Sequence, residues 1–204
     1  YATAATVELL AVMLPDSAFL MDRDLHHVNK RAQGRPPRKP LYTMADVEKV
    51  LGLLRHTRYH EPWTLMDGVR VEAFDAGHIL GSALTVFEFQ EGDRRFRLGM
   101  SGDLGRPGRP ILRDPERHAG VDVLVLESTY GDRLHSPAEE TERELAEVVR
   151  RTIARGGKLM VPAFAVGRTQ ELVATLHSLC ERGLIPEIPM YVDSPLASRT
   201  TSVF

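Results

Sequence analysis

The sequence predicts an α/β protein, and three patterns carry that prediction. Residues 82–89 and 94–100 alternate apolar and polar side chains on either side of an acidic, glycine-containing turn at 91–93, as the two strands of a hairpin do. Residues 121–126 (VDVLVL) form a nearly continuous apolar run, which is typical of a strand buried on both faces. After this run predicted helices alternate with predicted strands, and that order indicates parallel βαβ units.

The segment before the hairpin is predicted to be mostly helical. Thr6 is placed to cap a first helix, Pro15 to interrupt it, and Asp16 to cap a second helical run. A further helix is expected after Thr43, which begins the pattern of a capping box. Alternation over residues 69–73 then indicates a strand that leads into the hairpin.

The segment after residue 126 is predicted to contain two helices and two strands. Ser136, Pro137 and Glu139 form the pattern of a helix start, with a cap, a proline at the first helical position and a capping-box glutamate. Glycines follow both expected helices. The expected elements, in order, are a helix at 136–155, a strand at 158–164, a helix at 167–182 and a strand at 189–193.

Length and composition fit one or two ordinary globular domains, with 204 residues of which 43% are hydrophobic and 26% charged. The net charge of -2 excludes a basic surface over the whole chain, although a local basic cleft stays open. The basic segment 31–40 (RAQGRPPRKP) is interpreted as a solvated linker, with a nucleic-acid contact as the alternative. The single cysteine, Cys180, suits a reducing compartment, so the cytoplasm is expected. No apolar run approaches the roughly 20 residues of a membrane span, and no membrane partner is expected.

The two open ends of the hairpin carry the first candidate site. His78 precedes the first strand and Asp103 follows the second, so the hairpin delivers an imidazole and a carboxylate to one place. Both groups are good zinc ligands, but they are also common in loop hydrogen bonds and Asx turns. Glu127, at the end of the apolar run, is either an ordinary carboxylate at the end of a strand or a third group at the same edge.

Other candidates rest on weaker patterns. Arg168 begins a helix after a predicted strand, where backbone amides and a guanidinium favour anions, although a packing turn explains it equally well. Ser194 has a similar place at the end of the last predicted strand. His56 and His60 have the spacing of a metal pair on a helix, but no third ligand accompanies them, and a solvated helix end is the favoured interpretation.

Five segments in this order resemble the metallo-β-lactamase/β-CASP nucleases, a family that includes the polyadenylation endonuclease subunit and prokaryotic RNase relatives. The resemblance extends over nearly the whole chain, and its specificity comes from the order and spacing of the segments. The segments are AGHILGSA, SGDLG, LESTYGDR, VPAFAVGRTQE and VDSPLA.

The resemblance implies a role for each candidate residue. His78 matches a ligand to one zinc, and Asp103 matches the carboxylate that bridges two zinc ions. Glu127 matches an acid that orients a catalytic histidine supplied from later in the chain. His78, Asp103 and Glu127 are thereby the implied catalytic residues. Arg168 and Ser194 lie in segments that resemble those facing the substrate cleft, and they are candidate phosphate contacts.

The resemblance also implies two incomplete domains. Residues 1–134 correspond to the C-terminal portion of the metallo-β-lactamase core, an αββα sandwich, and residues 135–204 to the first βαβ units of the inserted β-CASP domain. The HxHxDH motif, which supplies most zinc ligands in the family, is absent from this sequence, as are the later histidine motifs. Together with the start at Tyr1 and the end at Phe204, this predicts an internal fragment that is inactive alone.

The implied function of the intact protein is zinc-dependent hydrolysis of RNA phosphodiester bonds. RNA is then the expected partner, with endonuclease or 5′-exonuclease mode open and a homodimer as the assembly to test. Three alternatives remain: a DNA nuclease of the same superfamily, a small-molecule hydrolase with the metallo-β-lactamase fold, and a non-catalytic RNA-binding scaffold. The segment 136–194 argues against the small-molecule hydrolase, because such enzymes lack the inserted domain.

Overall fold

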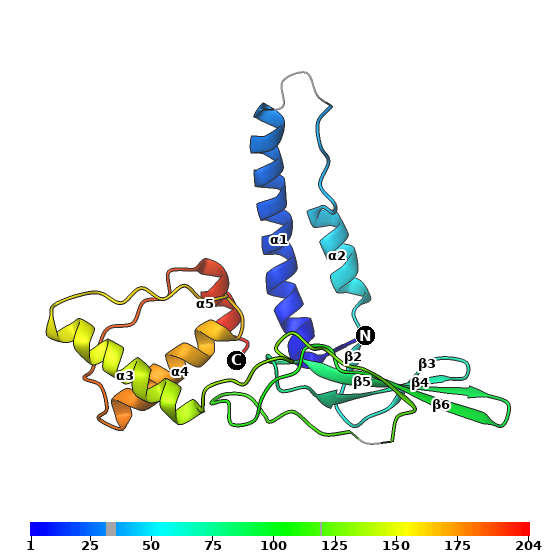
Figure 1. Ribbon diagram of the computed structural model, residues 1–204. Coiled ribbons are helices and arrows are strands. Elements are labelled where there is room, and N and C mark those ends of the chain that lie inside the picture. The colour runs from blue at the N-terminus through cyan, green and yellow to red at the C-terminus, as the bar shows by residue number, and fades with distance from the viewer. Residues whose placement is uncertain (32–35, 119) are drawn as a thin grey trace.

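The computed structural model describes residues 1–31, 36–118 and 120–204, and it confirms the mixed α/β class (Figure 1). A pair of helices rises from a twisted sheet, and three further helices follow the sheet in the chain. The elements, in order, are β1 (Ala2–Thr3), α1 (Ala4–Arg31), α2 (Met44–Leu53), β2 (His56–Thr57), β3 (Trp63–Met66), β4 (Val69–Asp75), β5 (Ala83–Glu91), β6 (Arg94–Met100), β7 (Val123–Val125), α3 (Ala138–Ala154), α4 (Arg168–Glu181) and α5 (Pro195–Thr201).

Within the described part of the chain, the main sheet has five strands in the order β3-β4-β5-β6-β7. The first four are antiparallel neighbours, and β7 joins β6 in parallel. The predicted hairpin is confirmed as β5 and β6, which pair from Glu91 opposite Arg94 at the turn to Thr85 opposite Met100. Phe74, Leu84 and Val86 form the buried cluster of this sheet. The alternation that predicted the hairpin therefore also sets which side chains are buried.

The predicted break at Pro15 is wrong, because α1 is one helix of 28 residues with Pro15 inside it. A proline in a helix interior removes a hydrogen bond and disfavours the helix. The flanking turns of α1 are supported by packing, since α1 contacts both α2 and α5. Thr6 is not the cap either: its amide donates to Thr3 Oγ1 at 3.4 Å, so the helix begins earlier.

The length of α1 bears on the expectation that no segment of this chain could span a membrane. Among the described residues, α1 is long and apolar enough to cross a membrane, judged by length and composition alone. Glu8 and Asp16 interrupt the apolar run and hide this in the sequence. A core helix of a soluble protein can meet the same criterion, so the expectation of no membrane partner stays untested.

The strands predicted at 158–164 and 189–193 are wrong, because both segments are irregular. The run 121–126 does form a strand, β7, but its three residues are 46–51% exposed rather than buried on both faces. A strand needs a neighbour for its backbone hydrogen bonds, and among the described residues β7 has one only on the β6 side. The described residues provide no neighbour for the two irregular segments, so the expected parallel βαβ units are not formed within them.

The helices α3 and α4 lie where they were predicted, and only the start of α3 differs. Pro137 is the N-cap of α3 and makes no side-chain capping bond, so the predicted Ser136 cap is wrong. The short helix α5 was not predicted. The predicted box at Thr43 is confirmed at the start of α2. The basic segment 31–40 lies partly outside the described residues, and neither interpretation of it is tested.

Candidate active site

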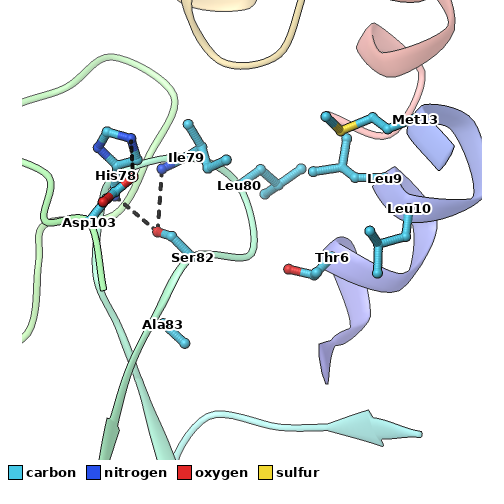
Figure 2. A pocket seen from close by; sticks show the side chains of 10 residues that line it. All are labelled: Thr6, Leu9, Leu10, Met13, His78, Ile79, Leu80, Ser82, Ala83 and Asp103. Carbon is cyan, nitrogen blue, oxygen red and sulfur yellow. Dashed lines mark hydrogen bonds and ion pairs between the residues drawn. The ribbon is translucent and has the colours of Figure 1, made fainter. Parts of the chain in front are cut away.

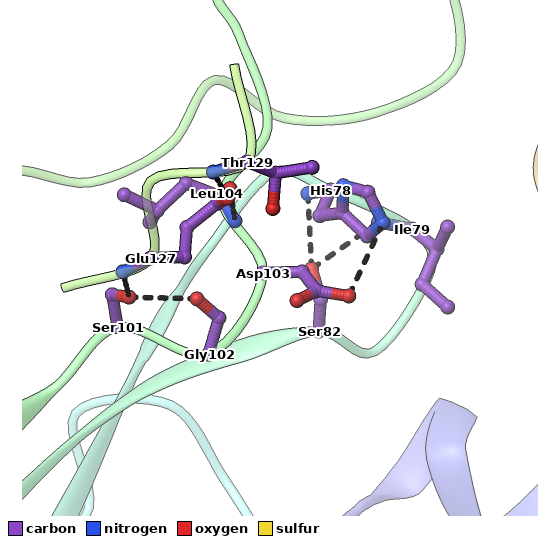
Figure 3. Close-up of polar contacts among 9 residues, drawn as sticks. All are labelled: His78, Ile79, Ser82, Ser101, Gly102, Asp103, Leu104, Glu127 and Thr129. Carbon is purple, nitrogen blue, oxygen red and sulfur yellow. Dashed lines mark hydrogen bonds and ion pairs between the residues drawn. The ribbon is translucent and has the colours of Figure 1, made fainter. Parts of the chain in front are cut away.

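His78 and Asp103 face each other where the hairpin opens (Figure 3). His78 lies in the turn between β4 and β5, and Asp103 lies in the loop after β6. The distance from His78 Nε2 to Asp103 Oδ2 is 3.8 Å, and their side chains are 38% and 76% exposed. The structure therefore brings the two predicted groups together and leaves both accessible to a ligand.

The turn that carries His78 is fixed by hydrogen bonds to Ser82. The Ser82 hydroxyl accepts from the backbone amides of His78 at 3.0 Å and Ile79 at 3.3 Å. The neighbouring Asp103 loop is joined to this turn by the Gly105 amide, which donates to the Ala76 carbonyl at 2.8 Å. The Ser82 side chain thus holds the His78 turn, and the backbone bond from Gly105 to Ala76 joins the Asp103 loop to that turn.

Close backbone packing explains the glycine at position 105. A Cβ added there would lie 1.7 Å from the carbonyl oxygen of Gly77, a separation that no side chain can occupy. Gly77 itself has φ +62, in the left-handed region that favours glycine. The two loops therefore cross in backbone contact at Gly77 and Gly105, and this contact sets the distance between His78 and Asp103.

Glu127 lies just after β7 and supports the Asp103 loop from the other side. Its Oε1 accepts from the amide of Leu104 at 3.0 Å, and its Oε2 accepts from the amide of Thr129 at 3.1 Å. These bonds, led by the one from the Leu104 backbone, hold the pKa of the Glu127 carboxyl below its usual range. The carboxylate is therefore ionised at neutral pH and positions the residue next to Asp103.

A cavity of about 470 Å³ joins these groups to positive charge. His78, Asp103 and Glu127 line it together with three arginines, Arg106, Arg109 and Arg168. Tyr130 and His135 add further polar atoms to the wall. The combination of a metal-ligand pair with several arginines suits a ligand that carries a phosphate group.

A smaller cavity of about 280 Å³ lies on the α1 side of His78 and Asp103 (Figure 2). Its wall is mainly apolar, with Leu9 and Met13 of α1 and with Ile79 and Leu80 of the turn among its lining residues. The polar groups that it shares with the larger cavity belong to the predicted pair. Most of the charged side chains near the pair therefore line the larger cavity.

Arg168 and Ser194 have different places in the structure. Arg168 is the first residue of α4 and lines the larger cavity. The Ser194 hydroxyl accepts from the amide of Ala197 at 3.1 Å and caps α5, and Ser194 is not among the residues that line the cavity. A phosphate contact by Ser194 therefore stays a prediction without geometric support.

The pair His56 and His60 lies elsewhere. His56 belongs to β2, not to a helix, and His60 Nε2 lies 3.2 Å from Glu116 Oε1. Within the described ranges no group of three or more His, Cys, Asp or Glu side chains could hold a metal ion. Both interpretations placed the pair on a helix, and that placement is wrong, because His56 lies in a strand and His60 in a turn.

Sequence reasoning missed an ion pair at the cavity. Arg109, in the loop after β6, donates to the carboxylate of Glu171 on α4. The two residues are 62 positions apart, and neither forms a local pattern that could have indicated the contact. Only the fold brings them together.

Several known proteins are similar to this chain over most or all of its length. The chain is 37% identical over 204 residues to "Ribonuclease TTHA0252" of Thermus thermophilus, which covers all of this chain and 42% of that protein. It is 33% identical over 166 residues to "Cleavage and polyadenylation specificity factor 73" of Drosophila melanogaster, covering 80% of this chain and 24% of that protein. It is 31% identical over 161 residues to an "RNase J-like protein" of Methanocaldococcus jannaschii, covering 78% and 38%.

These matches confirm the resemblance, and the chain is homologous to members of the metallo-β-lactamase/β-CASP nuclease family. It spans less than half the length of these relatives. No protein-family model matches the chain.

Proposed function

We propose that this chain is part of a metal-dependent hydrolase that cleaves phosphodiester bonds in RNA. The observation that carries the proposal is the shared cavity, where His78, Asp103 and Glu127 lie on one wall with three arginines. The names of two relatives contain the words ribonuclease and RNase, and a third is named for cleavage and polyadenylation. RNA is accordingly the proposed substrate, and the cytoplasm the proposed location.

The residues present fit a share of a zinc centre. The His78 imidazole and the Asp103 carboxylate are exposed, lie 3.8 Å apart and present nitrogen and oxygen donors, which zinc accepts. A catalytic zinc takes three protein ligands, so we propose that further ligands come from outside these 204 residues. By the resemblance, the intact protein would hold two zinc ions, with His78 as a ligand to one and Asp103 as a ligand to both. When bound, zinc supplies a nucleophile derived from water at neutral pH.

The other residues bind and position. The guanidinium groups of Arg106, Arg109 and Arg168 neutralise and orient a phosphate group in the cavity. Glu127 holds the amide of Leu104, and it thereby fixes the loop that presents Asp103. The resemblance adds a second role for Glu127, which is to orient a histidine that acts as the acid toward the leaving oxygen. Both carboxylate oxygens already accept backbone amides, so such a histidine would share an oxygen with one of them.

The substitution Asp103→Ala in the full-length protein tests this function. Cleavage of RNA should fall by more than about a thousandfold, because a lost transition-state contact of this kind costs on the order of 10²–10³ in rate and Asp103 also holds the metal. The fold should remain, since the Asp103 side chain is 76% exposed. Single-turnover cleavage assays in zinc-replete buffer measure the rate, and circular dichroism measures the fold.

The matched control is Asp93→Ala, an exposed carboxylate at the far turn of the same hairpin, which should leave cleavage unchanged. The 204-residue chain by itself should bind zinc weakly and cleave nothing, because it offers two of the required donors. Unchanged turnover in Asp103→Ala would refute the mechanism. Parallel assays with DNA separate the nuclease alternatives, and RNA binding without cleavage by the wild-type protein would favour the scaffold.

A further inference from the structure

Glu171 is a buried carboxylate whose partners come from two distant segments. Its Oε2 accepts from Nη2 of Arg109 in the loop after β6, and it lies 3.6 Å from Nη1 of Arg168 at the start of α4. The side chains of Glu171, Arg109 and Arg168 are 8%, 15% and 63% exposed. One carboxylate therefore holds a guanidinium group from the sheet side next to a guanidinium group from the helical side.

The charges and donors of this cluster point to an anion. An arginine has five N–H donors, and Glu171 is the one acceptor that the described residues give to Arg109. Both arginines line the larger cavity, so donors that Glu171 leaves unused are near its wall. Two guanidinium groups and one carboxylate carry a net charge of about +1, which complements the single negative charge of a phosphodiester. The carboxylate of Glu127 is bound on both oxygens by the backbone amides of Leu104 and Thr129, and no ion pair joins it to an arginine among the described residues.

The cluster is fixed relative to His78. Gly167, just before α4, packs against Ile79, the residue that follows His78. A Cβ at Gly167 would lie 2.9 Å from Ile79 Cγ2, and the φ of Gly167 is +81. The start of α4 is thereby seated on the turn that presents His78. A phosphate held by Arg109 and Arg168 would consequently lie at a fixed distance along the RNA from the bond that is cleaved at His78 and Asp103.

We propose that Glu171 is a positioning residue and that the arginines it holds, Arg109 and Arg168, together bind a backbone phosphate next to the one that is cleaved. This inference rests on the proposed function, which supplies the nucleic-acid strand. The Arg109–Glu171 pair acts on substrate binding, and it also joins the loop after β6 to α4. A purely structural ion pair would do only the second.

A charge exchange separates the two roles in the full-length protein. Arg109→Glu alone should destabilise the protein and raise KM for a short single-stranded RNA by about tenfold or more, because one charged hydrogen bond is lost and a carboxylate takes its place. Adding Glu171→Arg restores an ion pair between the same two positions and should recover the thermal unfolding midpoint. It should not recover KM, because position 109 now presents a carboxylate to the cavity, and kcat should change little throughout.

Recovery of KM together with stability would overturn the inference. The control exchange is Arg182→Glu with Glu142→Arg, an ion pair between the C-cap residue of α4 and α3 that is not part of the cavity lining, and it should leave KM unchanged. If the first exchange does not fold, Arg109→Gln decides by fluorescence anisotropy of RNA binding at several salt concentrations. Loss of one phosphate contact lowers the slope of log affinity against log salt by about 0.7, and an unchanged slope would overturn the inference.

The same measurements keep the two proposals apart. One outcome would refute the proposed function and leave phosphate binding by the cluster in place. The wild-type protein would bind RNA without cleaving it, and Arg109→Gln would lower the slope of log affinity against log salt as expected. Protein that cleaves RNA with an unchanged KM in the exchanged variant would refute the inference and leave the function in place.

Discussion

The sheet region, residues 56–127, and the helical region, residues 128–204, are held together in different ways. In the sheet region, β4, β5 and β6 share long hydrogen-bonded ladders, and the buried side-chain cluster is small. In the helical region the buried cluster is formed by side chains of α3, α4 and the turn after α4. Its members are Ala146, Val149, Leu176, Leu179 and Ile185. Backbone packing and hydrogen bonds to the Ser82 and Glu127 side chains therefore position His78 and Asp103, whereas apolar side-chain packing positions the helix that carries Arg168.

The largest effect is expected where two backbones touch in the sheet region. Gly105→Ala places a Cβ at 1.7 Å from the Gly77 carbonyl oxygen, so one of the two loops must move. We expect a loss of about 4 kcal/mol or more in the free energy of unfolding, the range of the most damaging single substitutions. RNA cleavage by the full-length protein should be lost with it. Urea unfolding of the 204-residue chain measures the free energy.

The matched control is Gly52→Ala in α2, where nothing lies within 4 Å of the added methyl group. Alanine favours a helix over glycine by about 1 kcal/mol, so this variant should be equal to the wild type or slightly more stable. A Gly105→Ala variant with wild-type stability would show that the loop crossing is not rigid. It would contradict the claim that backbone contacts position the site in the sheet region.

The next effect tests whether the two regions unfold separately. Leu179 is 1% exposed and lies at the centre of the helical cluster, so Leu179→Ala should cost about 2–5 kcal/mol. Hydrogen exchange should show lost protection for amides of α3 and α4, with amides of β4 to β6 unchanged. Leu134→Ala, at a side chain 99% exposed, is the control. Equal loss of protection in the sheet would mean that the regions form one cooperative unit.

Local patterns predicted much of the sheet region and of the candidate site. The turn at 91–93 and the alternation around it are properties of adjacent residues, so the hairpin followed from sequence. The hairpin in turn placed His78 and Asp103 at one end, and the structure has them 3.8 Å apart. The capping box at Thr43 is equally local and is also confirmed.

Features that depend on distant partners were not predictable. Apolar runs at 158–164 and 189–193 have the composition of strands, but a strand also needs a neighbour, and composition does not state whether one exists. Pro15 predicted a break because its cost is local, while the packing of α1 on α2 and α5 is not. The contact of Arg109 with Glu171 likewise exists only once the loop after β6 meets α4.

The smallest effect is a dependence on pH that should be confined to the sheet region. The hydroxyl of Tyr59 donates to the Ser82 carbonyl at 2.9 Å, and burial, followed by the charge of Asp75, raises the pKa of Tyr59 from 10.0 to about 12. Because the folded pKa is the higher one, the neutral tyrosine stabilises the fold fully below pH 10, and this stabilisation is lost as the pH rises from 10 toward 12. Urea midpoints of the wild type should therefore fall over that interval.

Tyr59→Phe removes the titrating group and should lower stability at neutral pH by about 1 kcal/mol, the usual value for a lost hydrogen bond. The difference between wild type and variant should then shrink above pH 10, since only the wild type loses a contribution there. Tyr130→Phe, at an exposed tyrosine of the helical region, should leave the pH profile unchanged. The Ser82 hydroxyl also holds the His78 amide, so alkaline loss of this contact should first expose amides of β4 and β5 to exchange. Earlier exchange in α3 or α4 would assign the pH dependence to the helical region and contradict the assignment to Tyr59.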